Sequence, residues 1–210
     1  MTIDKIICIG KNYKEHALEL GDSVSEKPVI FLKPPSILKQ INQWDEIINA
    51  TLPINHGDIH YECEIVLQLA NDGYQMDLAQ AEQTIHAVTL GLDMTLRNLQ
   101  TTLKKNGHPW TVAKVFPDAA IIGPWIPHHD FINYLDNEFS LIINNQLRQH
   151  ALGTQMIMKP AELLVYVSEY FPLCKGDIIF TGTPAGVGAI SSGDIAKLCW
   201  KDKCFEVKWK

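Results

Sequence analysis

Residues 59–69 combine acidic and apolar side chains in a pattern that could bind a metal ion. If the segment is a strand, its alternate apolar residues share one face, and His60, Glu62 and Glu64 lie together on the other. Two carboxylates that point the same way repel each other, and a bound divalent cation would relieve that repulsion. The alternative is a strand whose second face meets water, which is enough to explain a Glu-x-Glu pattern by itself.

Asp93 could supply a third carboxylate. It follows the apolar segment 87–92, and a helical pattern comes after it in which Asp93, Arg97 and Gln100 would share one face. Three carboxylates with water form an all-oxygen site, which suits Mg²⁺ or Mn²⁺ better than zinc or copper. Asp is also a common N-cap residue, so Asp93 could instead only begin the helix.

Lys114 ends a mostly apolar segment, residues 110–114. Near three carboxylates, its ammonium group would stay charged and could contact a substrate oxyanion. Without such a site, the side chain would extend its charged end into solvent.

His16 and Glu19 form a candidate acid–base pair. If residues 12–20 turn as a helix, the two side chains lie one turn apart on one face. A carboxylate can orient an imidazole and stabilise its protonated form, which makes the imidazole a general base for water. A His–Glu pair at this spacing is more often only a surface contact.

The segment at residues 181–188 is rich in glycine and threonine. Its glycine spacing fits neither a P-loop nor the dinucleotide-binding pattern. A loop with threonine hydroxyls, such as that of Thr183, and free backbone N–H groups can bind a carboxylate. A tight turn between two strands explains the segment equally well.

The elements that must position these residues are mostly strands. Apolar or alternating segments between turn residues predict strands at residues 5–10, 28–32, 59–69, 87–92, 139–143, 177–181 and 195–209. Helices are predicted at residues 77–86, 95–106 and 160–170. Because strands outnumber helices and do not alternate with them regularly, the pattern favours a β-rich α+β domain over a doubly wound sheet.

The composition is that of an ordinary globular chain of 210 residues with a net charge of −6. No basic cluster predicts nucleic-acid binding, and no apolar segment is long enough to predict a membrane helix. The five cysteines come without a secretory signal, so we expect no disulfide framework and a reduced, cytoplasmic setting.

The order of these segments resembles the fumarylacetoacetate hydrolase family, from about residue 6 to residue 207. The segments that carry the resemblance are Gly10-Lys11-Asn12-Tyr13 with His16 and Glu19, Phe31-Leu32-Lys33-Pro34, Tyr61-Glu62-Cys63-Glu64, Leu92-Asp93-Met94-Thr95 with Arg97 and Gln100, Pro109-Trp110 with Lys114, and Thr181-Gly182-Thr183-Pro184 with Gly186-Val187-Gly188. Each segment alone is unspecific, but their combination is specific. The chain is similar to the short members, of the acylpyruvate hydrolase and oxaloacetate decarboxylase type.

The resemblance implies a fold and a set of roles. The fold would be a single domain over residues 1–210, a mixed β-sandwich roll with a few short helices, and the protein would be a homodimer. The implied metal ligands are Glu62, Glu64 and Asp93. The implied water-activating pair is His16 and Glu19, carried on a lid that orders over the substrate. Lys114 would polarise the reacting oxygen, and the substrate would be held by Arg97, Gln100 and Thr183.

The activity that follows from the resemblance is metal-dependent hydrolysis of a carbon–carbon bond in a small acylpyruvate, through a pyruvate enolate. Oxaloacetate decarboxylation and tautomerisation of 2-oxo acids use the same enolate and stay open as alternatives, as does a non-catalytic, ligand-binding member. Two departures from the family pattern, Asn98 and the segment Val115-Phe116-Pro117, leave the identity of the substrate open.

Overall fold

Strands dominate the computed structural model, which describes residues 2–19, 21 and 27–210. The strands of the large sheet are β1 (Ile6–Gly10), β2 (Val29–Lys33), β3 (Leu38–Gln40), β6 (Cys63–Leu69), β7 (Ile85–Asp93), β9 (Ala120–Ile122), β10 (Ile126–Pro127) and β13 (Ile178–Phe180). A second sheet contains β4 (Ile47–Ala50), β11 (Phe139–Ile143), β12 (Gln146–Ala151), β15 (Ile195–Trp200) and β16 (Lys203–Trp209). A third, small sheet contains β5 (Ile59–Tyr61), β8 (Thr95–Leu96) and β14 (Gly188–Ile190).

The helices are short. They are α1 (Lys14–Glu19), α2 (Leu78–Thr84), α3 (Arg97–Lys105), α4 (Thr111–Lys114) and α5 (Pro160–Ser168). Single 3-10 turns lie at Pro35–Ile37, His128–Asp130, Tyr134–Asp136 and Gly153–Gln155. None of the described helices combines the length and the apolarity needed to cross a bilayer.

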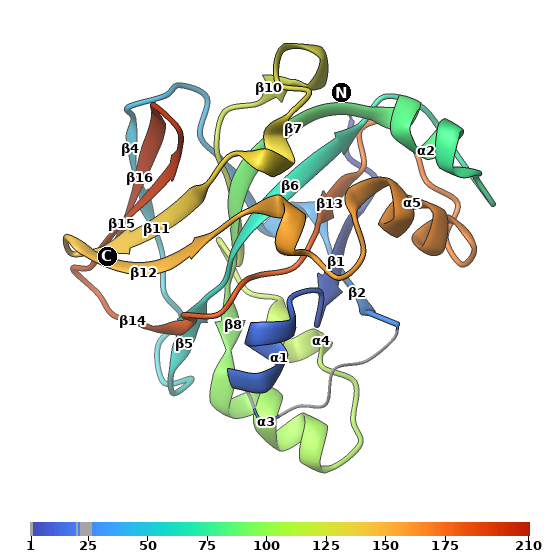
Figure 1. Cartoon of the computed structure of the whole chain (residues 1–210). Coiled ribbons are helices and arrows are strands. Elements are labelled where there is room, and N and C mark those ends of the chain that lie inside the picture. The colour runs from blue at the N-terminus through green and yellow to red at the C-terminus, as the bar shows by residue number, and fades with distance from the viewer. Residues whose placement is uncertain (1, 20, 22–26) are drawn as a thin grey trace.

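The sheets have mixed strand directions. The large sheet has the order β2-β1-β13-β6-β7-β9-β3, with β10 paired to β7, and the second has the order β12-β11-β15-β16-β4. Three pairs are parallel, namely β1 with β13, β3 with β9 and β4 with β16. Figure 1 shows the sheets curling past each other, with α1, α3 and α4 together near one end of β6 and β7. The predicted β-rich, mixed β-sandwich roll with few short helices is confirmed.

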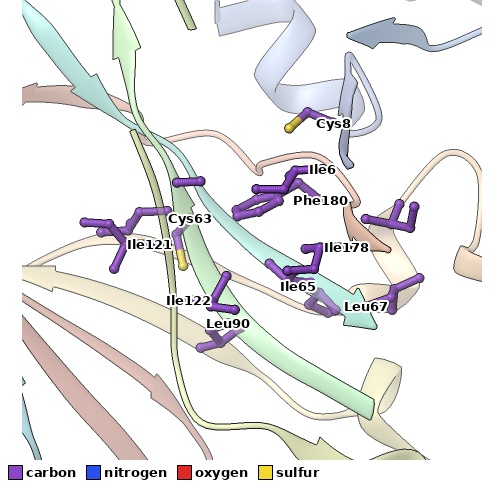
Figure 2. Close-up of a cluster of buried hydrophobic side chains, with 14 of the residues drawn as sticks. Ile6, Cys8, Cys63, Ile65, Leu67, Leu90, Ile121, Ile122, Ile178 and Phe180 are labelled. Atoms are coloured by element: carbon purple, nitrogen blue, oxygen red, sulfur yellow. The ribbon is translucent and has the colours of Figure 1, made fainter. Parts of the chain in front are cut away.

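The core lies around β6 and β7, which are central strands of the large sheet. Ile65, Leu90 and Ile178 come from adjacent strands and are fully buried, and they form part of the cluster in Figure 2. Both faces of these central strands are covered, so the strands are mostly apolar along their whole length. This rigid centre carries the acidic residues at one end of β6 and β7.

Local sequence signals explain where several helices begin. At α2, the Asp77 side chain accepts the Gln80 N–H at 2.8 Å and the Gln80 side chain accepts the Asp77 N–H at 2.9 Å. At α5, Pro160 occupies the first turn, where its missing N–H costs no hydrogen bond. Both helices therefore begin within a residue of their predicted starts.

Three predicted elements differ from the structure. The strand predicted at residues 59–69 is interrupted at Glu62, and the strand at 195–209 is a hairpin that turns between β15 and β16. The helix predicted from residue 95 begins at Arg97, because Thr95 and Leu96 instead pair with β5. Residues 39–55, for which the sequence predicts no helix or strand, contain β4 and the end of β3.

The expectation that the cysteines form no disulfide is wrong at one pair. Cys199 and Cys204 face each other across the β15–β16 hairpin, with their Cα atoms 4.3 Å apart, and are joined by a disulfide. The sequence predicts a single strand at residues 195–209, and in a single strand the two thiols would lie far apart. The other three cysteines, Cys8, Cys63 and Cys174, are free.

Candidate active site

Three buried carboxylates meet at the end of the central strands. Glu62 lies between β5 and β6, Glu64 lies in β6, and Asp93 is the last residue of β7. The Asp93 N–H donates to the Glu62 carbonyl oxygen at 2.9 Å, which holds the ends of these neighbouring strands together. One oxygen from each carboxylate lies within 4.8 Å of the others. All three residues are buried.

The electrostatics of this cluster are those of crowded acids. Burial raises the pKa of Glu64 well above its ordinary value, and the charges of Asp93 and Glu62 raise it further. Burial also opposes ionisation of Glu62, but Lys114 and Arg97 outweigh it and hold the pKa of Glu62 well below the usual range. Glu64 is therefore the carboxylate whose negative charge is least compensated. Among the described residues, it accepts one hydrogen bond, from the Gly182 N–H at 2.6 Å.

Lys114 is buried within the cluster rather than extended to solvent. Its Nζ donates to Glu62 Oε2 at 2.7 Å, to Asp93 Oδ2 at 2.8 Å and to Thr95 Oγ1 at 2.6 Å. Burial alone would lower the pKa of Lys114, but the charges of Asp93 and Glu62 raise it instead. The ammonium group therefore stays charged, as predicted for a lysine beside three carboxylates.

Lys33, at the end of β2, is a second buried ammonium group beside Asp93. Its Nζ lies 2.8 Å from Asp93 Oδ1 and donates to the backbone carbonyls of Met94, at 3.1 Å, and Ala119, at 2.8 Å. Asp93 Oδ1 therefore has close charge compensation from Lys33, although it accepts no hydrogen bond among the described residues. Sequence reasoning gave Lys33 no role. The signal it offered was a lysine that ends an apolar strand.

The donor set fits a hard divalent cation. Carboxylate oxygens are the ligands that Mg²⁺ and Mn²⁺ prefer. Three of them converge here from rigid strand ends, and one, Asp93 Oδ1, is buried without a hydrogen bond. A cation would also relieve the repulsion that raises the pKa of Glu64.

Arg97 and Gln100 approach the cluster from α3. The Arg97 guanidinium donates from Nη2 to Glu62 and from Nη1 to Gln100 Oε1, the latter at 2.6 Å. Asp93 does not share their helix, because β7 continues through it. The N-cap of α3 is Leu96, without a side-chain hydrogen bond, so the alternative role of Asp93 as an N-cap is wrong.

Arg97 has a third partner that sequence reasoning missed. Its Nε donates to His60 Nδ1 at 3.3 Å. Burial lowers the pKa of His60, and the charge of Arg97 lowers it further. His60 was expected on the same face as the glutamates, but the pattern gave no sign of which side chain it would contact.

His16 and Glu19 lie in α1, and His16 lines the same cavity as Asp93. His16 Nδ1 is 3.3 Å from Glu19 Oε2, and His16 is buried. The Asn12 side chain anchors the chain just before this helix by donating to the carbonyls of Thr181, at 2.8 Å, and Met158, at 3.0 Å. Residue 20, the last of the predicted helical segment 12–20, lies outside the described residues.

The loop that follows β13 binds carboxylates of the protein itself. The Gly182 N–H donates to Glu64, and the Gly186 N–H donates to Glu19 at 3.0 Å and 3.2 Å. Thr183 Oγ1 donates to the Cys63 carbonyl and accepts from the Gln149 side chain, both at 2.8 Å. The loop therefore fixes one glutamate of the acidic cluster and the partner of His16.

One cavity contains almost all of the predicted site. The predicted residues that line it are His16, Glu62, Glu64, Asp93, Arg97, Gln100, Lys114 and Thr183. Glu19 lies behind His16 and does not line the cavity. Phe31 and Trp110 add aromatic surface, and their ring centroids are 6.1 Å apart. Acid–base, cationic and candidate metal-binding groups thus face the same small space.

The chain matches the family described as fumarylacetoacetate (FAA) hydrolase C-terminal over residues 5–204. The oxaloacetate tautomerase YcgM of Escherichia coli (strain K12) is 35% identical to it over 193 residues, which cover 91% of this chain and 86% of that protein. The mitochondrial oxaloacetate decarboxylase of Dictyostelium discoideum is 37% identical over 194 residues, which cover 92% of this chain and 87% of that protein.

The fold has the same kind of relatives. The crystal structure of fumarylpyruvate hydrolase from Pseudomonas aeruginosa, in complex with Mn²⁺ and pyruvate, superposes with a TM-score of 0.91 at 32% identity. The similarity covers 99% of this chain and 91% of that one. By its sequence match, its relatives and its fold, this chain belongs to the fumarylacetoacetate hydrolase family.

Proposed function

We propose that this chain is a divalent-cation-dependent enzyme that interconverts the keto and enol forms of oxaloacetate or a closely similar 2-oxo acid. The observation that carries the proposal is that one cavity is lined by the three-carboxylate cluster and by His16, whose Nδ1 contacts Glu19. Enolisation needs both parts, a base for the proton on carbon and positive charge for the oxygen. The tautomerase and decarboxylase names of relatives at 35% and 37% identity support oxaloacetate as the substrate.

In this proposal, the cation is Mg²⁺ or Mn²⁺ and is held by Glu62, Glu64 and Asp93. When bound, such a cation supplies Lewis-acid polarisation of the 2-oxo group. The substrate carboxylate is held by Arg97, Gln100 and Thr183, which line the cavity around the cluster. These polar groups come from α3 and from the loop after β13, so they can bind the substrate from two sides.

The proton steps belong to His16 and Lys114. Glu19 binds Nδ1 of His16 and leaves Nε2 for the substrate. His16 Nε2 removes a proton from C3 of the keto acid and, once protonated, gives that proton to the 2-oxo oxygen. Lys114 Nζ donates its three N–H groups to Glu62, Asp93 and Thr95, and it would turn one of them to the same oxygen while negative charge develops there. The tautomers therefore interconvert with no net gain or loss of protons.

Hydrolysis of an acylpyruvate is the second candidate, and the His16–Glu19 pair favours it. The same imidazole could take a proton from water and direct the water to the 4-carbonyl group, which releases the pyruvate enolate. The likeness to a fumarylpyruvate hydrolase at 32% identity supports this candidate. Oxaloacetate decarboxylation uses the same enolate but requires no activated water.

The test compares three reactions of the purified protein with Mg²⁺, with Mn²⁺ and with a chelator. The decay of enol-oxaloacetate is followed by its ultraviolet absorbance, and pyruvate release is measured from oxaloacetate and from acetylpyruvate. We expect cation-dependent acceleration of the enol decay well above any pyruvate release. Pyruvate release from acetylpyruvate with no effect on the enol would replace the proposal with hydrolysis. Inactivity in all three reactions would refute both candidates.

A further inference from the structure

His60 contacts Arg97 from outside the cavity. Its Nδ1 accepts the Nε–H of Arg97 at 3.3 Å, yet His60 is not among the residues that line the cavity. It lies in the middle strand of the small sheet, paired with Ala189 of β14 on one side and Thr95 of β8 on the other. Because both neighbouring strands hold the His60 backbone, its imidazole can restrict the position of the long Arg97 side chain.

The other two partners of Arg97 differ from His60 in their position. Nη1 contacts Gln100 and Nη2 contacts Glu62, and both of these residues face the cavity. Under the proposed function, Glu62 binds the cation and Gln100 binds the substrate, so both contacts must change during the reaction. Among the partners that the described residues give Arg97, His60 is the one that a cation or substrate in the cavity would leave in place.

We propose that His60 is a positioning residue for Arg97, which fixes the plane of the guanidinium so that Nη1 and Nη2 face the carboxylate of a bound 2-oxo acid. The proposal rests on the proposed function, because it takes Arg97 as the group that binds this carboxylate. A guanidinium that pairs with a carboxylate needs a defined orientation, since its donors form a rigid planar fork. Fixing Nε sets that orientation without using the two terminal nitrogens.

The substitution pair His60→Asn and His60→Leu tests the acceptor. The asparagine carbonyl oxygen can take the place of Nδ1 as an acceptor, whereas leucine has a similar size and no acceptor. A hydrogen bond to a charged group is worth about a factor of ten or more in binding. We therefore expect His60→Leu to weaken oxalate binding, measured by calorimetry with Mg²⁺ present, by about tenfold or more, and His60→Asn to restore most of it.

The Mg²⁺ affinity of the same proteins without oxalate is the first control. Because His60 contacts none of the three proposed ligands and Lys114 also holds Glu62, we expect this affinity to change far less than the oxalate affinity in both variants. The exposed His86, at the opposite end of β7 from Asp93, provides the matched control His86→Leu. Equal oxalate affinity in all variants, or equal losses from His60→Leu and His86→Leu, would overturn the proposal.

A double-substitution experiment tests whether His60 acts through Arg97. In an Arg97→Met background, His60→Leu should cause no further loss of oxalate affinity. A further loss of similar size to that in the wild type would show that His60 acts by another route and would overturn the proposal.

The Arg97 Nε–H signal in a ¹⁵N NMR spectrum separates this proposal from the proposed function. We expect slow solvent exchange of that proton in the wild type and in His60→Asn, and fast exchange in His60→Leu. This result would support the positioning role even for a protein inactive with oxaloacetate and acetylpyruvate, which would refute only the proposed reactions. Fast exchange in the wild type would overturn the positioning role even in an active enzyme.

Discussion

Asp93 lies between two buried ammonium groups, Lys33 beside Oδ1 and Lys114 beside Oδ2. Its carboxylate can be held in one orientation because each oxygen faces a separate positive charge. A buried charge is costly unless it is paired, so the two ammonium groups stabilise this carboxylate in the interior. Lys33 does not line the cavity, so its contribution to the site passes through Asp93.

Replacing Lys33 by methionine keeps most of the side-chain volume and removes the charge. We expect the free energy of unfolding to fall by about 3 kcal/mol, because one partner of a buried ion pair is left uncompensated. Equilibrium unfolding in urea measures the change. Lys39→Met is the matched control, since Lys39 is about one-third exposed beside Asp118 and its pair should contribute about 1 kcal/mol or less. Similar losses in the two variants would contradict the account.

His16→Ala removes the proposed base. We expect the rate of enol-oxaloacetate decay to fall by about a hundredfold or more, the usual contribution of general acid–base catalysis. Mg²⁺ affinity should be unchanged, because His16 is not a ligand in the proposed cluster. The exposed His129 provides the control substitution His129→Ala. A tautomerase rate that survives the loss of His16 would assign the proton transfer to another group.

At the residue scale, the sequence was informative about residue types and silent about long-range contacts. Glu62, Glu64 and Lys114 could be singled out because acids in an apolar strand and a lysine after an apolar segment are unusual. The contacts of Lys33 and His60 could not be predicted, because their partners Asp93 and Arg97 are distant in the sequence and only the folded sheets bring them together. The roles of all of these residues stay predictions.

At the element scale, the loop after β13 is the connection between the two halves of the site. Its Gly182 N–H binds Glu64 of the acidic cluster, and its Gly186 N–H binds Glu19 of the acid–base pair. Both glycines have positive φ angles, 101° and 100°, a conformation that other residues seldom adopt. The loop geometry therefore sets how α1 sits relative to β6.

Gly186→Ala tests this connection. A Cβ atom at Gly186 would lie 2.0 Å from the carbonyl oxygen of Arg148, so the loop must move and the contact with Glu19 should be lost. We expect lower stability and a slower decay of enol-oxaloacetate. Gly193→Ala is the matched control, because Gly193 has a similar φ of 93° but no atom within 4 Å of an added Cβ. Equal activity in the two variants would contradict a connecting role for the loop.

The sequence predicted which segments form strands better than it predicted where they break. Apolar segments identified β1 and β7 because strands buried on both faces need apolar side chains on both faces. The break at Glu62 was not visible, because the alternation continues through it, and the β15–β16 turn was missed although the charged residues 201–203 interrupt the apolar pattern there. The disulfide between Cys199 and Cys204 was missed with it, since it depends on that turn.

At the scale of the whole molecule, the fold was predictable from the resemblance more than from the pattern of elements. Counting strands and helices gave a β-rich α+β class, but the mixed roll came from the order of the motifs. Strand order depends on contacts between distant segments, such as the pairing of β1 with β13, that local periodicity does not encode. The predicted homodimer stays a prediction, and sedimentation of the purified protein would test it.

The stability of the whole molecule should fall at alkaline pH. Burial raises the pKa of Tyr134 far above its ordinary value, and burial does the same for Tyr13. The unfolded chain releases these protons above about pH 10 while the folded chain keeps them, so the free energy of unfolding falls as the pH rises. Tyr134→Phe should flatten this dependence in urea unfolding. The control Tyr74→Phe, at an exposed site, should leave it unchanged.

We expect the acidic cluster and the His16–Glu19 pair to act together in enolising a 2-oxo acid. The most direct measurement is the exchange of the methyl protons of pyruvate for deuterium in D₂O, followed by NMR, because it reports enolisation whatever reaction comes after it. The account predicts Mg²⁺-dependent exchange with the wild type, and loss of this exchange with a chelator or in His16→Ala. Absence of exchange from a protein that binds both Mg²⁺ and pyruvate would contradict it.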